Sequence, residues 1–61
     1  MKLNKTHKRM MEVICFVINK GQHRLFLAAC QLEEAGYGSL ETVIDGTHVY
    51  FKFKANEVMR F

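Results

Sequence analysis

Histidine, cysteine and acidic side chains are the residues of this 61-residue chain that could catalyse a reaction or bind a metal. Structural zinc sites need closely spaced pairs of His or Cys ligands. Cys15 and Cys30 have no C-x-x-C spacing, and His7, His23 and His48 are far apart in the sequence. We therefore expect surface histidines and two reduced core cysteines. No metal and no cofactor are predicted.

The acidic residues do not form a catalytic pair. Glu33 and Glu34 are adjacent, so on a helix their side chains point about 100° apart. The sequence contains no nucleophile elbow, no phosphate-binding glycine loop and no H-E-x-x-H motif. A chain this short can enclose only a small pocket. We predict that the protein is not an enzyme.

Basic side chains gather at both ends of the chain, around an acidic middle. Residues 1–24 contain six Lys or Arg and one acid, residues 25–51 contain four acids and no Lys or Arg, and residues 52–61 contain three Lys or Arg and one acid. This asymmetry favours a polyanionic partner such as nucleic acid, although an acidic protein would use the same cations. The candidate nucleic-acid or partner-binding residues are Lys5, Lys8, Arg9, Arg24, His48, Tyr50, Lys52 and Lys54.

The first half of the chain predicts two helices that position part of these cations. A helix is expected from the N-cap Thr6 to about Lys20, with its apolar stripe at Met10, Val13, Ile14 and Val17. The run from 13 to 18 also has strand propensity, but the length and the stripe favour a helix. A second helix is expected from about His23 to Ala35, ended by Gly36 or Gly38 and buried through Leu25, Ala28, Ala29 and Leu32.

The second half predicts a β-hairpin. Asp45 and Gly46 lie between two alternating runs and are typical of a two-residue type I′ turn. In that register Ile44 faces Thr47, Thr42 faces Val49 and Leu40 faces Phe51. An apolar face, which includes Phe53, is then directed toward the helices, and an opposite face displays Glu41, Val43, His48, Tyr50, Lys52 and Lys54.

These elements predict one α+β domain over residues 1–61, a helical hairpin followed by an antiparallel β-hairpin (ααββ). A chain of this length buries only about 60% of its unfolded surface, and 49% of its residues are apolar. We therefore expect a homodimer formed through the first helix and the apolar tail 55–61. The longest apolar run has six residues, against about 20 for a membrane span, and no signal-peptide pattern is found. We expect a cytoplasmic protein that does not associate with a membrane.

Residues 32–53 resemble a known family. The segments Leu32-Glu33-Glu34-Ala35-Gly36-Tyr37 and Glu41-Thr42-Val43-Ile44-Asp45-Gly46-Thr47-His48-Val49-Tyr50-Phe51-Lys52-Phe53 resemble the recognition-helix end and β-wing of winged-helix transcription regulators. The resemblance implies that the hairpin tip is a wing beside the sugar-phosphate backbone. Only about ten residues separate Gln22 from Glu33, so the resemblance is to a reduced winged helix, which is compatible with binding DNA or protein.

Two functions are consistent with these observations. The first is a small non-enzymatic regulator that binds DNA or a nucleic-acid-associated protein complex through basic strips on the first helix and on the outer face of the hairpin. The alternative is a small phage-type inhibitor or adaptor that binds a larger host protein complex and blocks or redirects it.

Overall fold

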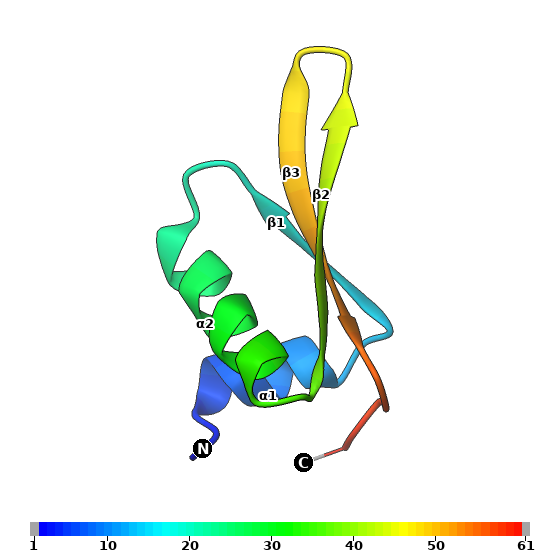
Figure 1. Cartoon of the computed structure of the whole chain (residues 1–61). Helices are drawn as coiled ribbons and strands as arrows, with labels where there is room; N and C mark the ends of the chain where they lie inside the picture. Colours follow the sequence, from blue (N-terminus) through cyan, green and yellow to red (C-terminus); the bar gives the residue numbers. More distant parts are fainter. Residues whose placement is uncertain (1, 61) are drawn as a thin grey trace.

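The computed structural model describes residues 2–60, which form an α+β fold with a three-stranded antiparallel sheet (Figure 1). The predicted fold class is therefore confirmed. The elements follow one another along the chain as α1 (Lys5–Met11), β1 (Cys15–Asn19), α2 (His23–Glu34), β2 (Gly38–Asp45) and β3 (His48–Ala55).

Helix α1 begins with a capping box. Its N-cap is Asn4, two residues before the predicted Thr6. The Asn4 side-chain oxygen accepts a hydrogen bond from the His7 backbone N–H at 3.0 Å, and His7 Nδ1 accepts one from the Asn4 N–H at 3.1 Å. These bonds satisfy two backbone donors that a helix start leaves without partners. Met10 and Met11 are fully buried, so α1 is short but firmly attached to the core.

The prediction of one helix from Thr6 to Lys20 is wrong beyond Met11, because Cys15–Asn19 is strand β1. Its alternating burial directs Phe16 and Ile18 toward the helices and leaves Val17 exposed. Pairing with β3, in which Ile18 lies opposite Phe51, supplies the hydrogen bonds that the isolated segment lacks. The strand propensity of residues 13–18 therefore prevails over their helical spacing.

Helix α2 agrees with the prediction and ends one residue earlier than expected. It buries Ala28, Ala29 and Leu32. It ends in a Schellman motif, in which Gly36 has φ +85° and its N–H donates to Glu33 O at 3.0 Å, while the Tyr37 N–H donates to Leu32 O at 2.9 Å. The short link at Gly21 joins α2 to β1 rather than to the first helix. Helices α1 and α2 pack together, but strand β1 lies between them in the sequence, so they do not form a helical hairpin.

The sheet has the strand order β1-β3-β2. The β2–β3 turn differs from the prediction: Asp45 pairs with His48, and the two-residue loop is Gly46 and Thr47. Among the described residues only glycines have positive φ, and Gly46 has φ +61°, which is the pattern of a type II′ turn.

This turn shifts the hairpin register by two residues. Leu40 lies opposite Phe53, Thr42 opposite Phe51 and Ile44 opposite Val49. Because the shift is an even number of residues, every side chain keeps its predicted face.

The core lies between the helices and one face of this sheet. Its fully buried members include Phe53 and Ile18 from the sheet and Leu32 from α2. The tail after β3 also packs against it: the Met59 N–H donates to Met11 O at 3.0 Å. The expected contribution of Phe61 lies outside the described residues. No helix within residues 2–60 has the length and hydropathy needed to cross a membrane.

Candidate functional site

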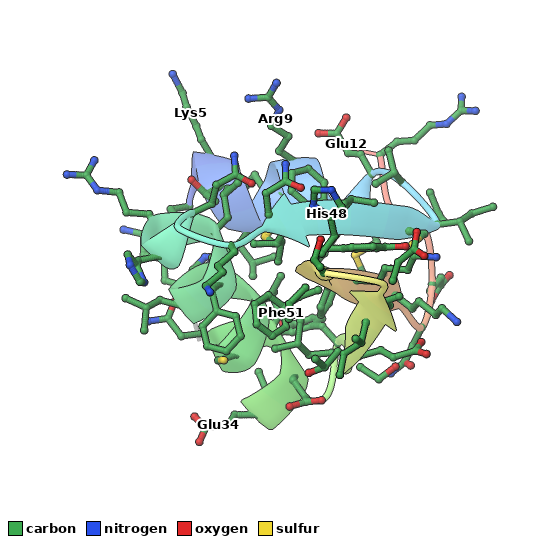
Figure 2. All side chains as sticks on the ribbon, turned by 90° about the horizontal axis from the view of Figure 1, so that it is seen from above. Lys5, Arg9, Glu12, Glu34, His48 and Phe51 are labelled. Atoms are coloured by element: carbon green, nitrogen blue, oxygen red, sulfur yellow. The ribbon has the colours of Figure 1, made fainter. Side chains whose placement is uncertain are left out.

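The cations predicted on the first helix are exposed on α1. Lys5 and Arg9 are four residues apart and therefore share a face, and Lys8 is exposed beside them. Figure 2 shows Lys5 and Arg9 projecting outward on the same side of the molecule, with the Glu12 carboxylate nearby. They border a groove of about 380 Å³, the α1 groove, which is lined by Lys5, Thr6, Arg9, Phe16, Val17, Asn19, Gln22 and Leu25.

The second predicted strip lies on the outer face of the sheet, opposite the helices. Tyr50 and Lys52 are half-buried, while His48 and Lys54 are exposed. Lys52 Nζ lies 5.9 Å from the centroid of the Tyr50 ring, a cation–π distance. Lys54 Nζ lies 3.3 Å from a Glu41 carboxylate oxygen. This ion pair compensates the charge of Lys54, so we expect Lys54 to contribute least to an anion-binding surface.

A second groove, of about 400 Å³, runs between the end of β1 and the hairpin tip. We call it the hairpin groove. It is lined by Asn19, Lys20, Asp45, Thr47, His48, Val49 and Tyr50.

Asn19 lines both grooves, so the end of β1 connects the α1 groove with the hairpin groove. On the same sheet face Val17 lies opposite Lys52, and Asn19 lies opposite Tyr50. The end of β1 therefore lies between the groove that borders the α1 cations and the groove at the hairpin tip.

Lys20 was not among the predicted site residues. The predicted first helix had Lys20 at its end, whereas this residue lies in the turn from β1 into α2. Asn19 closes this turn, because its N–H donates to Gln22 Oε1 at 2.8 Å and its carbonyl accepts from the Gln22 N–H at 3.1 Å. Gly21, with φ +98°, permits the reversal. The signal available in the sequence was the polar cluster 19–22, which is typical of a turn.

Arg24 is exposed in the first turn of α2 but lines neither the α1 groove nor the hairpin groove. Further along α2, the Glu33 carboxylate accepts a hydrogen bond from the Leu40 N–H at 2.8 Å. The C-terminal half of α2 is thus tied to β2 and carries the exposed acids Glu33 and Glu34. Carboxylates at these positions oppose contact with phosphate.

His7 has a structural role. His7 is buried, and its Nε2 lies 2.8 Å from Gln31 Oε1, which joins α1 to α2. Because Nδ1 accepts from the Asn4 backbone, Nε2 carries the proton and donates to Gln31. The surface position predicted for His7 is therefore wrong.

Both cysteines are free. Cys15 is exposed on the outer face of the sheet, so its predicted core position is wrong, while Cys30 is half-buried. Within residues 2–60 no three His, Cys, Asp or Glu side chains come together in a way that could hold a metal ion.

Comparison of the chain with known proteins finds no matching family model, no matching curated protein and no matching solved structure. The function is therefore inferred from the chain's own surface.

Proposed function

We propose that the protein is a small non-enzymatic regulator that binds nucleic acid, or a nucleoprotein complex, along the surface formed by the α1 groove, the end of β1 and the hairpin groove. The observation that carries the proposal is the shared position of Asn19 in both grooves. The surface that these grooves form around Asn19 carries Lys5, Arg9, Lys20 and His48. We call this surface the track.

The chemistry of this track suits a phosphate backbone. Flexible cations supply most of the affinity of non-specific nucleic-acid binding, because they displace condensed counterions. Asn19 and Gln22 add amide groups that hydrogen-bond to phosphate or sugar oxygens. Tyr50, in the hairpin groove, offers a ring on which an unpaired base can stack. Asp45 is the carboxylate in the hairpin groove and limits the charge there.

The resemblance of residues 32–53 to a winged-helix β-wing is a second, independent support. The hairpin projects beyond α2 (Figure 1), as a wing that reaches a backbone must. Since Glu33 and Glu34 oppose phosphate contact by the end of α2, we propose that contacts come from α1 and the hairpin, without sequence reading by α2 in the major groove.

Charge reversal in the track tests the proposal. Lys5→Glu combined with Arg9→Glu, and separately Lys20→Glu, should weaken binding to duplex and single-stranded oligonucleotides. Each lost phosphate contact should also reduce the salt dependence, by about 0.9 in the slope of log K against log salt for duplex DNA. The matched control is Lys2→Glu, because Lys2 lines a different groove together with Glu34. The proposal fails if the wild-type protein shows no salt-dependent binding, or if Lys2→Glu is as harmful as Lys20→Glu.

The alternative function, an inhibitor or adaptor that binds a larger host protein complex, is favoured by one observation. Apolar side chains are exposed near the start of β1: Val13 at 42%, Ile14 at 76% and Val58 at 44% relative exposure. The hydrogen bond from the Met59 N–H to Met11 O brings the tail that carries Val58 to the end of α1, close to the segment 12–14 that joins α1 to β1. Exposed apolar patches mark protein-interaction sites. Salt-insensitive capture of one host protein, lost in Ile14→Asp and kept in the Lys5→Glu, Arg9→Glu variant, would favour this function.

A further inference from the structure

Strand β1 is an edge strand, because the strand order β1-β3-β2 gives it a single neighbour in the sheet. Asn19 shows which backbone groups of β1 face outward, since its N–H and C=O both bond to Gln22 rather than to β3. The backbone groups of successive residues in an antiparallel strand point alternately to its two sides. Val17 and Cys15, which belong to the same alternate set as Asn19, therefore direct their N–H and C=O groups away from β3.

The hairpin turn gives the same assignment independently. Asp45 and His48 close a two-residue loop, and such a closing pair exchanges hydrogen bonds. Counting in twos from His48, the even-numbered residues of β3 bond to β2 and the odd-numbered residues bond to β1. The partners of these odd-numbered residues in β1 are Ile18 and Phe16, which again leaves Val17 directed to the outer edge.

This outer edge of β1 is unpaired and accessible. Within residues 2–60 no hydrogen-bond partner is found for the backbone groups of Val17 or Cys15. Val17 is 48% exposed, and Cys15 is exposed as well. A row of unpaired N–H and C=O groups is a template on which another extended chain can add as a strand.

The α1 groove runs beside this edge, because residues of β1 line it together with residues of α1. In Figure 2 the cyan strand β1 lies between the hairpin and the α1 cations Lys5 and Arg9. Phe16 and Leu25 give the groove an apolar wall, since both are half-buried against the core. A strand added to β1 therefore lies over the groove, with a polar and an apolar surface beneath it.

The charge of the groove indicates an acidic occupant. Of the described residues that line it, Lys5 and Arg9 are charged and none is acidic. Within residues 2–60 neither of these cations is paired with a carboxylate, and Glu12, which lies nearby, does not line the groove. The opposite edge of the sheet differs, because there the Glu33 carboxylate accepts the Leu40 N–H. An acidic strand is repelled at that edge and attracted to β1.

We propose that β1 accepts an extended acidic segment of another protein as a fourth strand of the sheet. The backbone of the segment pairs with Val17 and Cys15, and its carboxylates reach Lys5 and Arg9. Alternate side chains of an added strand point toward the helices, so one alternate set of the segment enters the α1 groove. A second copy of β1 does not fit, because residues 15–19 contain no acid and the copy brings its own Lys5 and Arg9.

The edge pairing does not depend on the proposed nucleic-acid binding. Nucleic acid has phosphates that the cations can contact, but it has no peptide backbone that can continue the ladder of a sheet. Both ligands use Lys5 and Arg9. An acidic segment that occupies the groove therefore excludes nucleic acid from this part of the track, and backbone-directed changes in the ligand separate the two kinds of binding.

Binding of backbone-modified peptides to the wild-type protein tests the proposal. The probe is a fluorescent, end-blocked peptide of about ten residues that alternates Thr and Glu, and its matched control alternates Thr and Lys. The Thr–Glu peptide should bind with a Kd below about 1 mM, and the Thr–Lys peptide at least about tenfold more weakly. Methylating the backbone nitrogens of one alternate set should weaken binding by at least about tenfold, while methylating the other set should change it by less than about threefold.

Two results of this experiment would overturn the proposal. One is the absence of binding up to about 1 mM of the Thr–Glu peptide. The other is an equal loss from the two methylated sets, because a ligand held by charge alone does not distinguish one edge of its backbone from the other.

Variants of the protein test the same edge from its other side. Val17→Pro removes the outward N–H, which a ladder edge facing solvent tolerates, and should weaken binding of the Thr–Glu peptide at least about tenfold more than Val17→Ala. Arg9→Glu should weaken it, whereas Lys2→Glu should not, because Lys2 lines a different groove. Circular dichroism checks the fold, and if Val17→Pro unfolds, the methylated peptides decide.

Two outcomes with these variants contradict the proposal. Peptide binding that Arg9→Glu abolishes and a folded Val17→Pro retains would show electrostatic attraction without strand addition. Sedimentation equilibrium of the free protein covers the remaining occupant: self-association that is lost in Val17→Pro would identify a second copy of the chain at this edge.

Discussion

The base and the tip of the β2–β3 hairpin are built from the same two strands but lie in different environments. At the base, Leu40 lies opposite Phe53, which is fully buried beneath the helices. At the tip, Ile44 lies opposite Val49 and is 73% exposed. Both pairs point to the same face of the sheet. The difference shows that strand alternation selects the face of a side chain, whereas the length and position of the helices decide whether that face is covered.

The largest loss of stability is expected from a substitution at the base of the hairpin, where Phe53 packs into the core. Phe53→Ala should lower the free energy of unfolding by about 3–5 kcal/mol, since it leaves a cavity beneath both helices. Ile44→Ala, measured at a concentration where the chain is monomeric, should change it by less than about 0.5 kcal/mol. Urea unfolding of both variants provides the measurement. Similar losses at the two positions would contradict the contrast between base and tip.

A smaller effect is expected at the first residue of β2. A Cβ added at Gly38 would lie 2.6 Å from the Phe53 ring and even closer to the Lys54 carbonyl oxygen. The backbone must therefore shift, and Gly38→Ala should cost about 1–3 kcal/mol. Ser39→Ala is the control, since Ser39 is exposed on the other face of the same strand. Thermal unfolding that shows equal stability for Gly38→Ala and the wild type would rule out this close approach.

Substitution in the capping box tests how much the start of α1 contributes to the stability of the helical layer that covers the base of the hairpin. Asn4→Ala removes the acceptor for the His7 N–H and should cost about 1 kcal/mol. Asn4→Asp should retain most of the stability that Asn4→Ala loses, because aspartate keeps a side-chain acceptor at the N-cap. Denaturant midpoints of the two variants provide the comparison. Equal midpoints for Ala and Asp would mean that the cap does not stabilise the helix.

The smallest effect is expected on the outer face of the sheet. The Lys54 and Glu41 side chains are 55% and 56% exposed, so water and salt screen their ion pair. Lys54→Met should change the free energy of unfolding by less than about 0.5 kcal/mol. A double-mutant cycle with Glu41→Gln isolates the pair itself. A coupling free energy well above 1 kcal/mol would show that this face is less accessible to solvent than the structure indicates.

Local signals determined α2 and the faces of the hairpin. Gly36 permits the left-handed residue of the Schellman motif, and the spacing of Leu25, Ala28, Ala29 and Leu32 places small and apolar residues on one side of the helix. In the hairpin, alternation assigned Leu40, Phe51 and Phe53 to the helical side even though the turn and the register were wrong. An error of two residues preserves the face because the period of a strand is two.

Only the tertiary structure decided the state of residues 15–19 and, with it, the candidate site. A short apolar run satisfies the spacing of a helix and the propensity of a strand, and the choice depends on whether a partner strand is available. Here β3 offers a second edge, so the run pairs with it as β1. That pairing lies about 35 residues away in the sequence, as in Phe16 with Phe53, beyond the reach of any local pattern. The position of Asn19 at the end of β1, where it lines both the α1 groove and the hairpin groove, follows from this pairing.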